Sequence, residues 1–240
     1  MSDHSEPPRT LTVSQFLIGA GLFEGGMLVV AFALGWLVNV HPTAELQWTQ
    51  EGWWMGIVAT GPLLLFLAAG FLSRSGGLRQ IREFLLEVLG PMLHGCRLID
   101  ILFLALLAGV CEEVLFRGLV YQFARDINPT FAIMVTNILF GLAHAITPMY
   151  AWLAGIMGLY LTALMTLTPE PNLLIPIVAH TLYDFIAFLI VRWDYRRRRA
   201  ARRQQLAEQQ APEQSQSDAA ADSAADKGPD SAPNDGPPVA

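Results

Sequence analysis

The sequence predicts an all-α protein: a polytopic membrane helical bundle with about six transmembrane helices, one amphipathic surface helix and a disordered C-terminal tail. The chain of 240 residues is 53% hydrophobic and only 15% charged, whereas soluble domains are about one quarter charged. Its apolar residues gather in runs that approach the roughly 20 residues needed to cross a bilayer. The C-terminal segment is almost entirely polar, so the preceding part is more apolar than the average suggests.

Six apolar runs are predicted to span the membrane. They cover residues 16–38, 53–72, 98–123, 131–146, 150–167 and 173–191. Between the second and third runs, residues 78–93 alternate apolar and charged positions at helical spacing, which predicts an amphipathic helix on the membrane surface. Four segments are predicted: an N-terminus (1–15), the first two spans with the amphipathic linker (16–97), a transmembrane core (98–192), and a basic segment with an acidic tail (193–240).

The distribution of arginine predicts the orientation. Arginines follow the second span and the sixth span, whereas the loops after the first and fifth spans contain neither lysine nor arginine. The positive-inside rule therefore places both termini in the cytoplasm of a multi-pass inner (plasma) membrane protein. Arg125 is the exception, and Asp126 lies beside it in the sequence.

The C-terminal tail is predicted to be disordered. After Arg203 the chain is rich in Ala, Asp, Gln, Pro and Ser, a composition that cannot bury a core. The arginine cluster at 196–203 is expected to contact anionic membrane lipids. No nucleic-acid partner is expected. The two cysteines, Cys96 and Cys111, predict no disulfide.

Ionisable side chains interrupt the apolar runs, where they normally mark a functional site. They are Glu24, Glu112, Glu113, Arg117, His144, His180 and Asp184. Several share a helix face, because residues four apart lie on one side of a helix. Glu113 with Arg117, His180 with Asp184, and Phe140 with His144 have this spacing.

These residue types suit the activation of water. A buried glutamate can act as a general base, and an imidazole can share a proton with water, bind a metal or donate to an oxyanion. Each group alone also has a structural explanation: an ion pair between helices, a core histidine, or an interhelical hydrogen bond. Glu24 has no obvious partner, and an interior hydrogen bond or a supporting role at the site remain open for it.

Three motifs resemble those of the CPBP family, the CAAX prenyl endopeptidases and bacteriocin-processing proteins once grouped as abortive-infection proteins. They read Glu112-Glu113-x-x-x-Arg117, Phe140-x-x-x-His144 and His180-x-x-x-Asp184. The resemblance covers about residues 98–191. It implies an all-helical bundle whose conical cavity opens to the membrane and cytoplasm, and a glutamate-dependent intramembrane endopeptidase.

The resemblance also implies roles for these residues. Glu112 would be the general base, with His144 helping to orient and deprotonate the water. His180 and Asp184 would line the oxyanion hole, while Glu113 and Arg117 would position the site. Many members have Asn where this chain has Asp184, and an ionised carboxylate cannot donate to an oxyanion. Asp184 is therefore expected to hold His180 in the correct tautomer.

Zinc is an alternative to a metal-free site, since one glutamate and two histidines can bind Zn²⁺ with an open position for water. The metal-free site, without cofactor, is favoured here because the carboxylates lie beside Arg117 and the chain has no H-E-x-x-H motif.

Two other functions compete with a protease that acts on a peptide or membrane-protein substrate. A non-catalytic scaffold or immunity protein would keep the fold and modulate a membrane partner. A proton-coupled carrier would also need intramembrane carboxylates, but inverted repeats are expected there and none is visible. The physiological substrate, its cleavage site, any use of prenylated substrates and the oligomeric state do not follow from the sequence.

Overall fold

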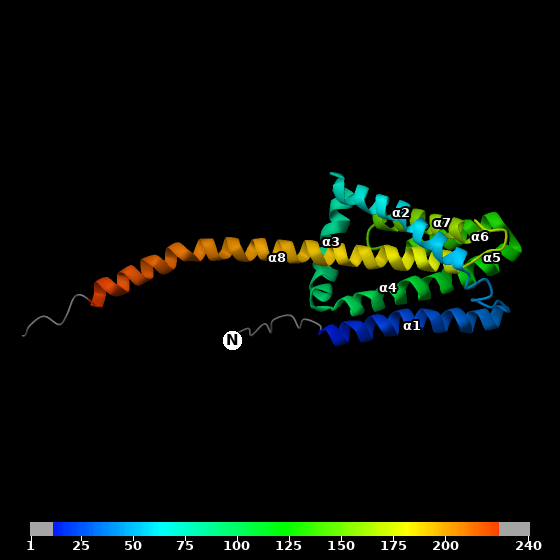
Figure 1. The fold of residues 1–240 in the computed structure, drawn as a ribbon, viewed down its shortest axis with the longest axis horizontal. Coiled ribbons are helices and arrows are strands. Elements are labelled where there is room, and N and C mark those ends of the chain that lie inside the picture. Colours follow the sequence, from blue (N-terminus) through cyan, green and yellow to red (C-terminus); the bar gives the residue numbers. More distant parts are fainter. Residues whose placement is uncertain (1–11, 226–240) are drawn as a thin grey trace, which may run out of the picture. The chain divides into compact units, whose positions relative to one another are not determined.

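The computed structural model describes residues 12–225, with side chains through residue 210. Every regular element in this range is helical, and it contains no strand (Figure 1). The predicted all-α class is therefore confirmed. The chain divides into two units, Met1–Tyr195 and Arg196–Ala240.

Two long helices open the first unit. Helix α1 (Val13–Val38) begins at Thr12, whose side chain accepts a hydrogen bond from the backbone of Gln15, and ends at Asn39 in the left-handed conformation. Helix α2 (Gln50–Leu72) begins at Thr49, which accepts from Gly52 in the same way. Such N-terminal caps satisfy backbone groups that the helix itself leaves unpaired.

Helix α3 (Gly76–Gly95) is the predicted amphipathic helix. It lies across one end of the bundle, at a steep angle to the other helices (Figure 1). Leu86, Gly90 and Leu93 are its buried residues, so its apolar face packs onto the bundle. This direction is the one expected for a helix in the plane of the membrane surface.

The third predicted span is divided into three helical pieces. Helix α4 (Leu98–Glu113) passes without a break into a π-helical segment, η1 (Val114–Tyr121), which continues as α5 (Gln122–Ile127). The wider π turn begins directly after Glu112 and Glu113. Such segments occur frequently at functional sites.

Three further helices complete the first unit. Helices α6 (Pro129–Ala143) and α7 (Pro148–Met165) each begin with proline at the first helical position, where its missing N–H costs nothing. They pack closely, because a Cβ atom at Gly141 would lie 2.6 Å from the carbonyl oxygen of Ala151. Helix α8 (Leu174–Ala225) begins in this unit and extends into the second.

The outer surface of the first unit is apolar. Leu22, Phe23, Trp36 and Leu37 are all at least 69% exposed on α1 alone. A water-soluble protein rarely shows such a surface, whereas lipid covers it without cost. The molecule is therefore a membrane protein.

Four helical stretches are long and apolar enough to cross a membrane: Val13–Val38, Gln50–Leu72, Pro148–Met165 and Leu174–Gln210. Helix α6 is apolar but shorter. The third predicted span is broken up by η1 and carries four charged residues. The prediction of six spans thus corresponds to four long helices plus shorter apolar ones.

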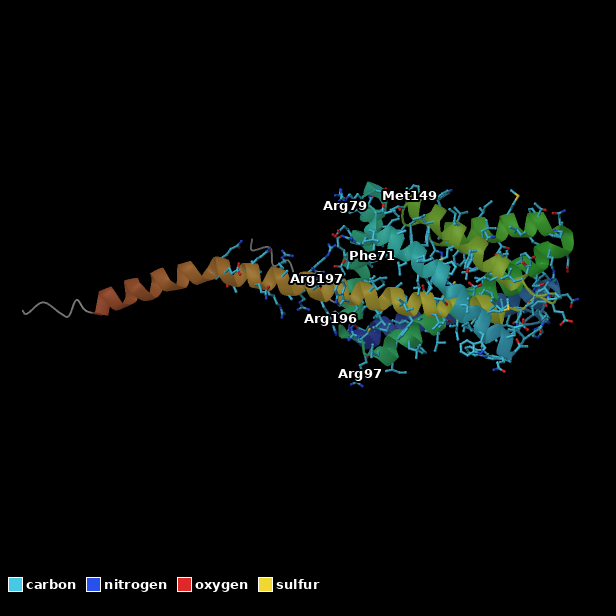
Figure 2. The ribbon with its side chains drawn as sticks, turned by 45° about the horizontal axis from the view of Figure 1, so that its top comes forward. Phe71, Arg79, Arg97, Met149, Arg196 and Arg197 are labelled. Atoms are coloured by element: carbon cyan, nitrogen blue, oxygen red, sulfur yellow. The ribbon has the colours of Figure 1, made fainter. Side chains whose placement is uncertain are left out.

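Charged residues are distributed unequally between the two ends of the bundle. Figure 2 shows Arg79 and Arg97 at the end where α3 lies. At the other end Arg125 donates to Glu45 of the α1–α2 loop, with Nη2 and Oε1 3.1 Å apart. Arg125, the exception to the arginine rule, therefore has an acidic partner that is distant in the sequence.

The tail differs from the sequence prediction over part of its length. Disorder is predicted after Arg203, whereas α8 continues to Ala225. The physical reason is composition, because Ala, Gln, Glu and Arg are strong helix formers even where no core is available. The last fifteen residues, 226–240, and the N-terminal segment before residue 12 lie outside the described residues.

Candidate active site

A buried ion pair forms the base of the site. Glu113 and Arg117 are both 0% exposed, and Nη1 of Arg117 donates to Oε1 of Glu113 over 2.9 Å. The same oxygen lies 2.8 Å from Nδ1 of His180. Glu113 thus makes two charge-assisted contacts, one within the α4–η1 segment and one that joins this segment to α8.

Arg117 makes contacts with two more helices. Its Nη2 donates to the carbonyl oxygen of Gly158 over 2.7 Å, and its Nε donates to the hydroxyl of Thr162 over 3.3 Å. The Thr162 hydroxyl donates in turn to Oδ1 of Asn137 on α6. The guanidinium also lies over the ring of Phe140, 4.5 Å from its centroid. A fully buried charge is tolerated because each side of it has a partner.

Glu112 points away from Arg117's ion pair, towards the Nε2 atoms of two histidines. Its Oε2 lies 3.7 Å from Nε2 of His144 and 4.0 Å from Nε2 of His180. These separations are too long for direct hydrogen bonds. Oε2 is buried and has no hydrogen-bond partner among the described residues. Two acceptors or donors about 4 Å apart can both reach one water molecule at hydrogen-bond distance.

The hydrogen bonds of the other ring nitrogens determine what each Nε2 can do. Nδ1 of His144 lies 2.8 Å from the carbonyl oxygen of Phe140. A carbonyl only accepts, so Nδ1 carries the proton and Nε2 of the neutral ring is a proton acceptor. Nδ1 of His180 likewise donates to the Glu113 carboxylate.

Asp184 lies beside His180 but does not fix its tautomer. Its Oδ2 is 3.6 Å from Nε2 of His180, beyond hydrogen-bond distance. The sequence led us to expect this acceptor role for Asp184, and in the structure Glu113 takes it. Asp184 instead presents its carboxylate to the same space as Glu112.

Close helix packing makes this geometry possible. A Cβ atom at Gly109 would lie 2.8 Å from the backbone nitrogen of Thr181, so glycine allows α4 and α8 to approach at the level of the site. A Cβ atom at Gly158 would lie 3.1 Å from Nη2 of Arg117 and 2.9 Å from Oδ1 of Asn137. Glycine there leaves room for the guanidinium to reach the α7 backbone.

A cavity of about 310 Å³ leads to the site. Its polar end contains Glu112, His144, His180 and Asp184. Much of the remaining wall is apolar and comes from α2, α3, α7 and α8. The residues of α3 that line the cavity are Leu78, Ile81, Arg82, Leu85 and Leu89. Helix α3 therefore borders the space that a substrate would enter.

The structure brings together all the residues that the motifs suggested. Phe140 lies between the others, with its ring centroid 4.6 Å from that of His144 and 6.1 Å from that of His180. The sequence reasoning missed Asn137, Gly158 and Thr162. A signal existed for Asn137, since it is polar within an apolar run and two helical turns before His144.

Among residues 12–210, whose side chains the structure describes, no group of three or more His, Cys, Asp or Glu side chains is arranged to hold an ion. The two imidazoles direct Nε2 at one glutamate oxygen, and Arg117 lies behind the neighbouring carboxylate. The buried cysteines Cys96 and Cys111 are both free thiols.

The family comparison covers the same part of the molecule. Residues 95–186 match the family model described as type II CAAX prenyl endopeptidase Rce1-like. This segment is Rce1-like. The Rce1-like segment runs from the end of α3 into α8 and contains every residue of the three motifs, so the resemblance to CPBP proteins is confirmed there. At the family level it indicates a CAAX-type intramembrane protease. No match was found among curated proteins or solved structures.

Proposed function

We propose that this protein is an intramembrane endopeptidase that hydrolyses a peptide bond in a membrane-associated or peptide substrate with water activated by Glu112 and His144. The observation that carries the proposal is the unpartnered, buried Oε2 of Glu112, within 4.0 Å of the Nε2 atoms of His144 and His180 at the end of a cavity. The Rce1-like match supports protease activity independently.

In the proposed reaction, a single water molecule donates two hydrogen bonds. One goes to the carboxylate of Glu112 and the other to Nε2 of His144. The water oxygen attacks the carbonyl carbon of the scissile bond while one proton passes to the carboxylate. When the C–N bond breaks, the protonated carboxyl returns this proton to the leaving amine. General acid–base catalysis of this kind contributes about 10²–10⁴-fold.

His180 is proposed to stabilise the developing oxyanion. Glu113 fixes its Nδ1–H, and in the doubly protonated ring Nε2–H is free to donate to the oxyanion. Arg117 holds Glu113 in place, so Glu113 and Arg117 are positioning residues. Asp184, which as a carboxylate cannot donate, is proposed to balance the charge of this imidazolium. The active site needs no metal or other cofactor.

The protein is further proposed to lie in the plasma membrane with both termini in the cytoplasm. The location of Arg79 and Arg97 at the end where α3 lies supports this orientation. The cavity borders α3 and would then be reached from the cytoplasmic side.

The test compares wild type with Glu112→Gln by mapping new protein N-termini in membranes of cells that express each form. We expect N-termini that appear with wild type, vanish with the isosteric amide and survive treatment with a chelator. Glu51→Gln, at an exposed position in the first turn of α2, is the matched control and should retain cleavage.

Other outcomes have defined meanings. Loss of cleavage with the chelator would contradict the metal-free mechanism. Equal N-termini from wild type and Glu112→Gln, with both forms folded, would contradict the protease and favour a scaffold or immunity protein that modulates a membrane partner.

A further inference from the structure

A third carboxylate, Glu24, faces the cavity from outside the Rce1-like segment. It comes from α1, well before residue 95, and lines the same cavity as Glu112 and Asp184. Its Oε2 is buried and has no hydrogen-bond partner among the described side chains or backbone. The reaction proposed above does not use Glu24. A carboxylate kept in an apolar helix without a partner indicates that its partner comes from elsewhere.

Carboxylates outnumber cations at this end of the cavity, because the imidazolium proposed at His180 balances only one of them. Glu24, Glu112 and Asp184 all line it, and Glu112, which is only 8% exposed, also has an unpartnered oxygen. The nearest guanidinium of the site, that of Arg117, is already bound to Glu113. Among the described cavity-lining residues the only Arg or Lys is Arg82 on α3. It pairs with Glu83 and lies over the ring of Phe71.

The helix surface beside Glu24 leaves space for a ligand. A Cβ atom added at Gly21, Gly25 or Gly26 would have no neighbour within 4 Å. The bundle therefore leaves open space directly beside these three positions of α1. Elsewhere the wall is apolar, with Leu67, Phe71, Met157 and Phe188 among its residues.

We propose that Glu24 binds a cationic side chain of the peptide substrate, that of Lys or Arg, at a position close to the scissile bond. The apolar wall would contact the methylene groups of that side chain, and the carboxylate would accept from its charged end. This inference rests on the proposed function, because it names the substrate class of the same site. Glu24 is thus a specificity-determining residue rather than a catalytic one.

The physical reason is desolvation. A carboxylate removed from water and left without a partner is costly, and a substrate cation supplies both a charge and hydrogen-bond donors. A neutral side chain of the same length supplies neither. Hydrogen bonds to charged groups correspond to a preference of about 10- to 100-fold for the basic substrate.

The test uses the full-length protein in proteoliposomes and a library of peptides with blocked N-termini. Wild type is expected to enrich Lys or Arg at one fixed position relative to the cleaved bond. For a cleaved peptide, the ratio of kcat/KM between the Lys form and its norleucine analogue should fall about 10- to 100-fold in Glu24→Gln. Glu24→Asp should recover part of the ratio, and Glu51→Gln should keep all of it.

A binding measurement separates this inference from the proposed function. The affinities of the Lys and norleucine peptides are measured for two variants, the single Glu112→Gln and the double Glu112→Gln with Glu24→Gln. Each measurement is made in the presence and in the absence of a chelator. Preferential binding of the Lys peptide that requires Glu24 and resists the chelator supports the cation subsite, even where wild type cleaves nothing and the protease proposal fails.

Three results would contradict the proposed subsite. In the first, wild type cleaves peptides without preferring Lys or Arg at any position. In the second, Glu24→Gln retains the preference for the basic peptide. In the third, Glu112→Gln binds the Lys and norleucine peptides equally. A preference that disappears with the chelator would instead indicate a metal ion at Glu24, which also contradicts the proposal.

Discussion

At the scale of single residues, adjacent glutamates in one helix have opposite environments. Oε2 of each carboxylate has no hydrogen-bond partner among the described residues. Oε1 of the enclosed Glu113 is bound by Arg117 and His180, whereas Glu112 lines the cavity. The orientation of the helix decides this difference, because consecutive side chains point about 100° apart. The pair therefore combines a structural carboxylate with one that is available for chemistry.

Arg117→Lys is expected to lower both stability and activity. Lysine is a point charge without the fixed fork of guanidinium, so it cannot donate to Glu113, Gly158 and Thr162 at once. Breaking a buried ion pair costs about 3–5 kcal/mol, and we expect a large part of that loss here. Thermal unfolding in detergent measures it. Arg79→Lys, at an exposed position of α3, is the control. Equal Tm values for Arg117→Lys and Arg79→Lys would contradict the role of the Arg117 guanidinium.

At the scale of helices, the approach of α4 to α8 places Glu113 within reach of His180. Gly109 permits this approach, and η1 begins immediately after the glutamates. Cys111 and Glu112 are buried on the same short stretch. The π segment then carries Arg117 to the layer formed by α6 and α7, where its remaining partners lie.

Gly109→Val is expected to separate these helices. Its side chain would meet the backbone of Thr181, which cannot rotate away as a flexible side chain could. Overpacking of this kind costs about 1–3 kcal/mol, and the contact between Glu113 and His180 should weaken with it. Tm and peptidase activity should both fall. Gly25→Val, where an added Cβ meets no neighbour, is the comparison for Tm. Unchanged Tm and peptidase activity in Gly109→Val would show that close packing of α4 and α8 is not required.

At the scale of the whole molecule, the membrane determines which surfaces are apolar and where arginine occurs. Large exposed side chains cover α1 and α2. Apart from the buried Arg117 of the site and Arg125, the described arginines of the first unit occur in α3, beside it, or after the apolar part of α8. Arg125 is neutralised by Glu45. The distribution follows the charge rule once this ion pair is included.

The proposed orientation predicts which loops label from outside the cell. Cysteines introduced at Ala44 and Glu170, in a chain without Cys96 and Cys111, should react with an impermeant maleimide in intact cells. A cysteine at Ser75, between α2 and α3, should react only after the membrane is opened. The reverse pattern would contradict a cytoplasmic location for both termini.

The sequence by itself determined the all-helical class, the amphipathic helix and the residues of the candidate site. These depend on periodicity, on apolar length and on the cost of burying charge, which are local properties. The tertiary structure decided which glutamate lines the cavity, that Glu113 rather than Asp184 fixes the His180 tautomer, and that Glu24 reaches the cavity. It also identified Asn137, Gly158 and Thr162 as partners of the site. These outcomes depend on contacts between helices distant in the chain, for which no local pattern exists.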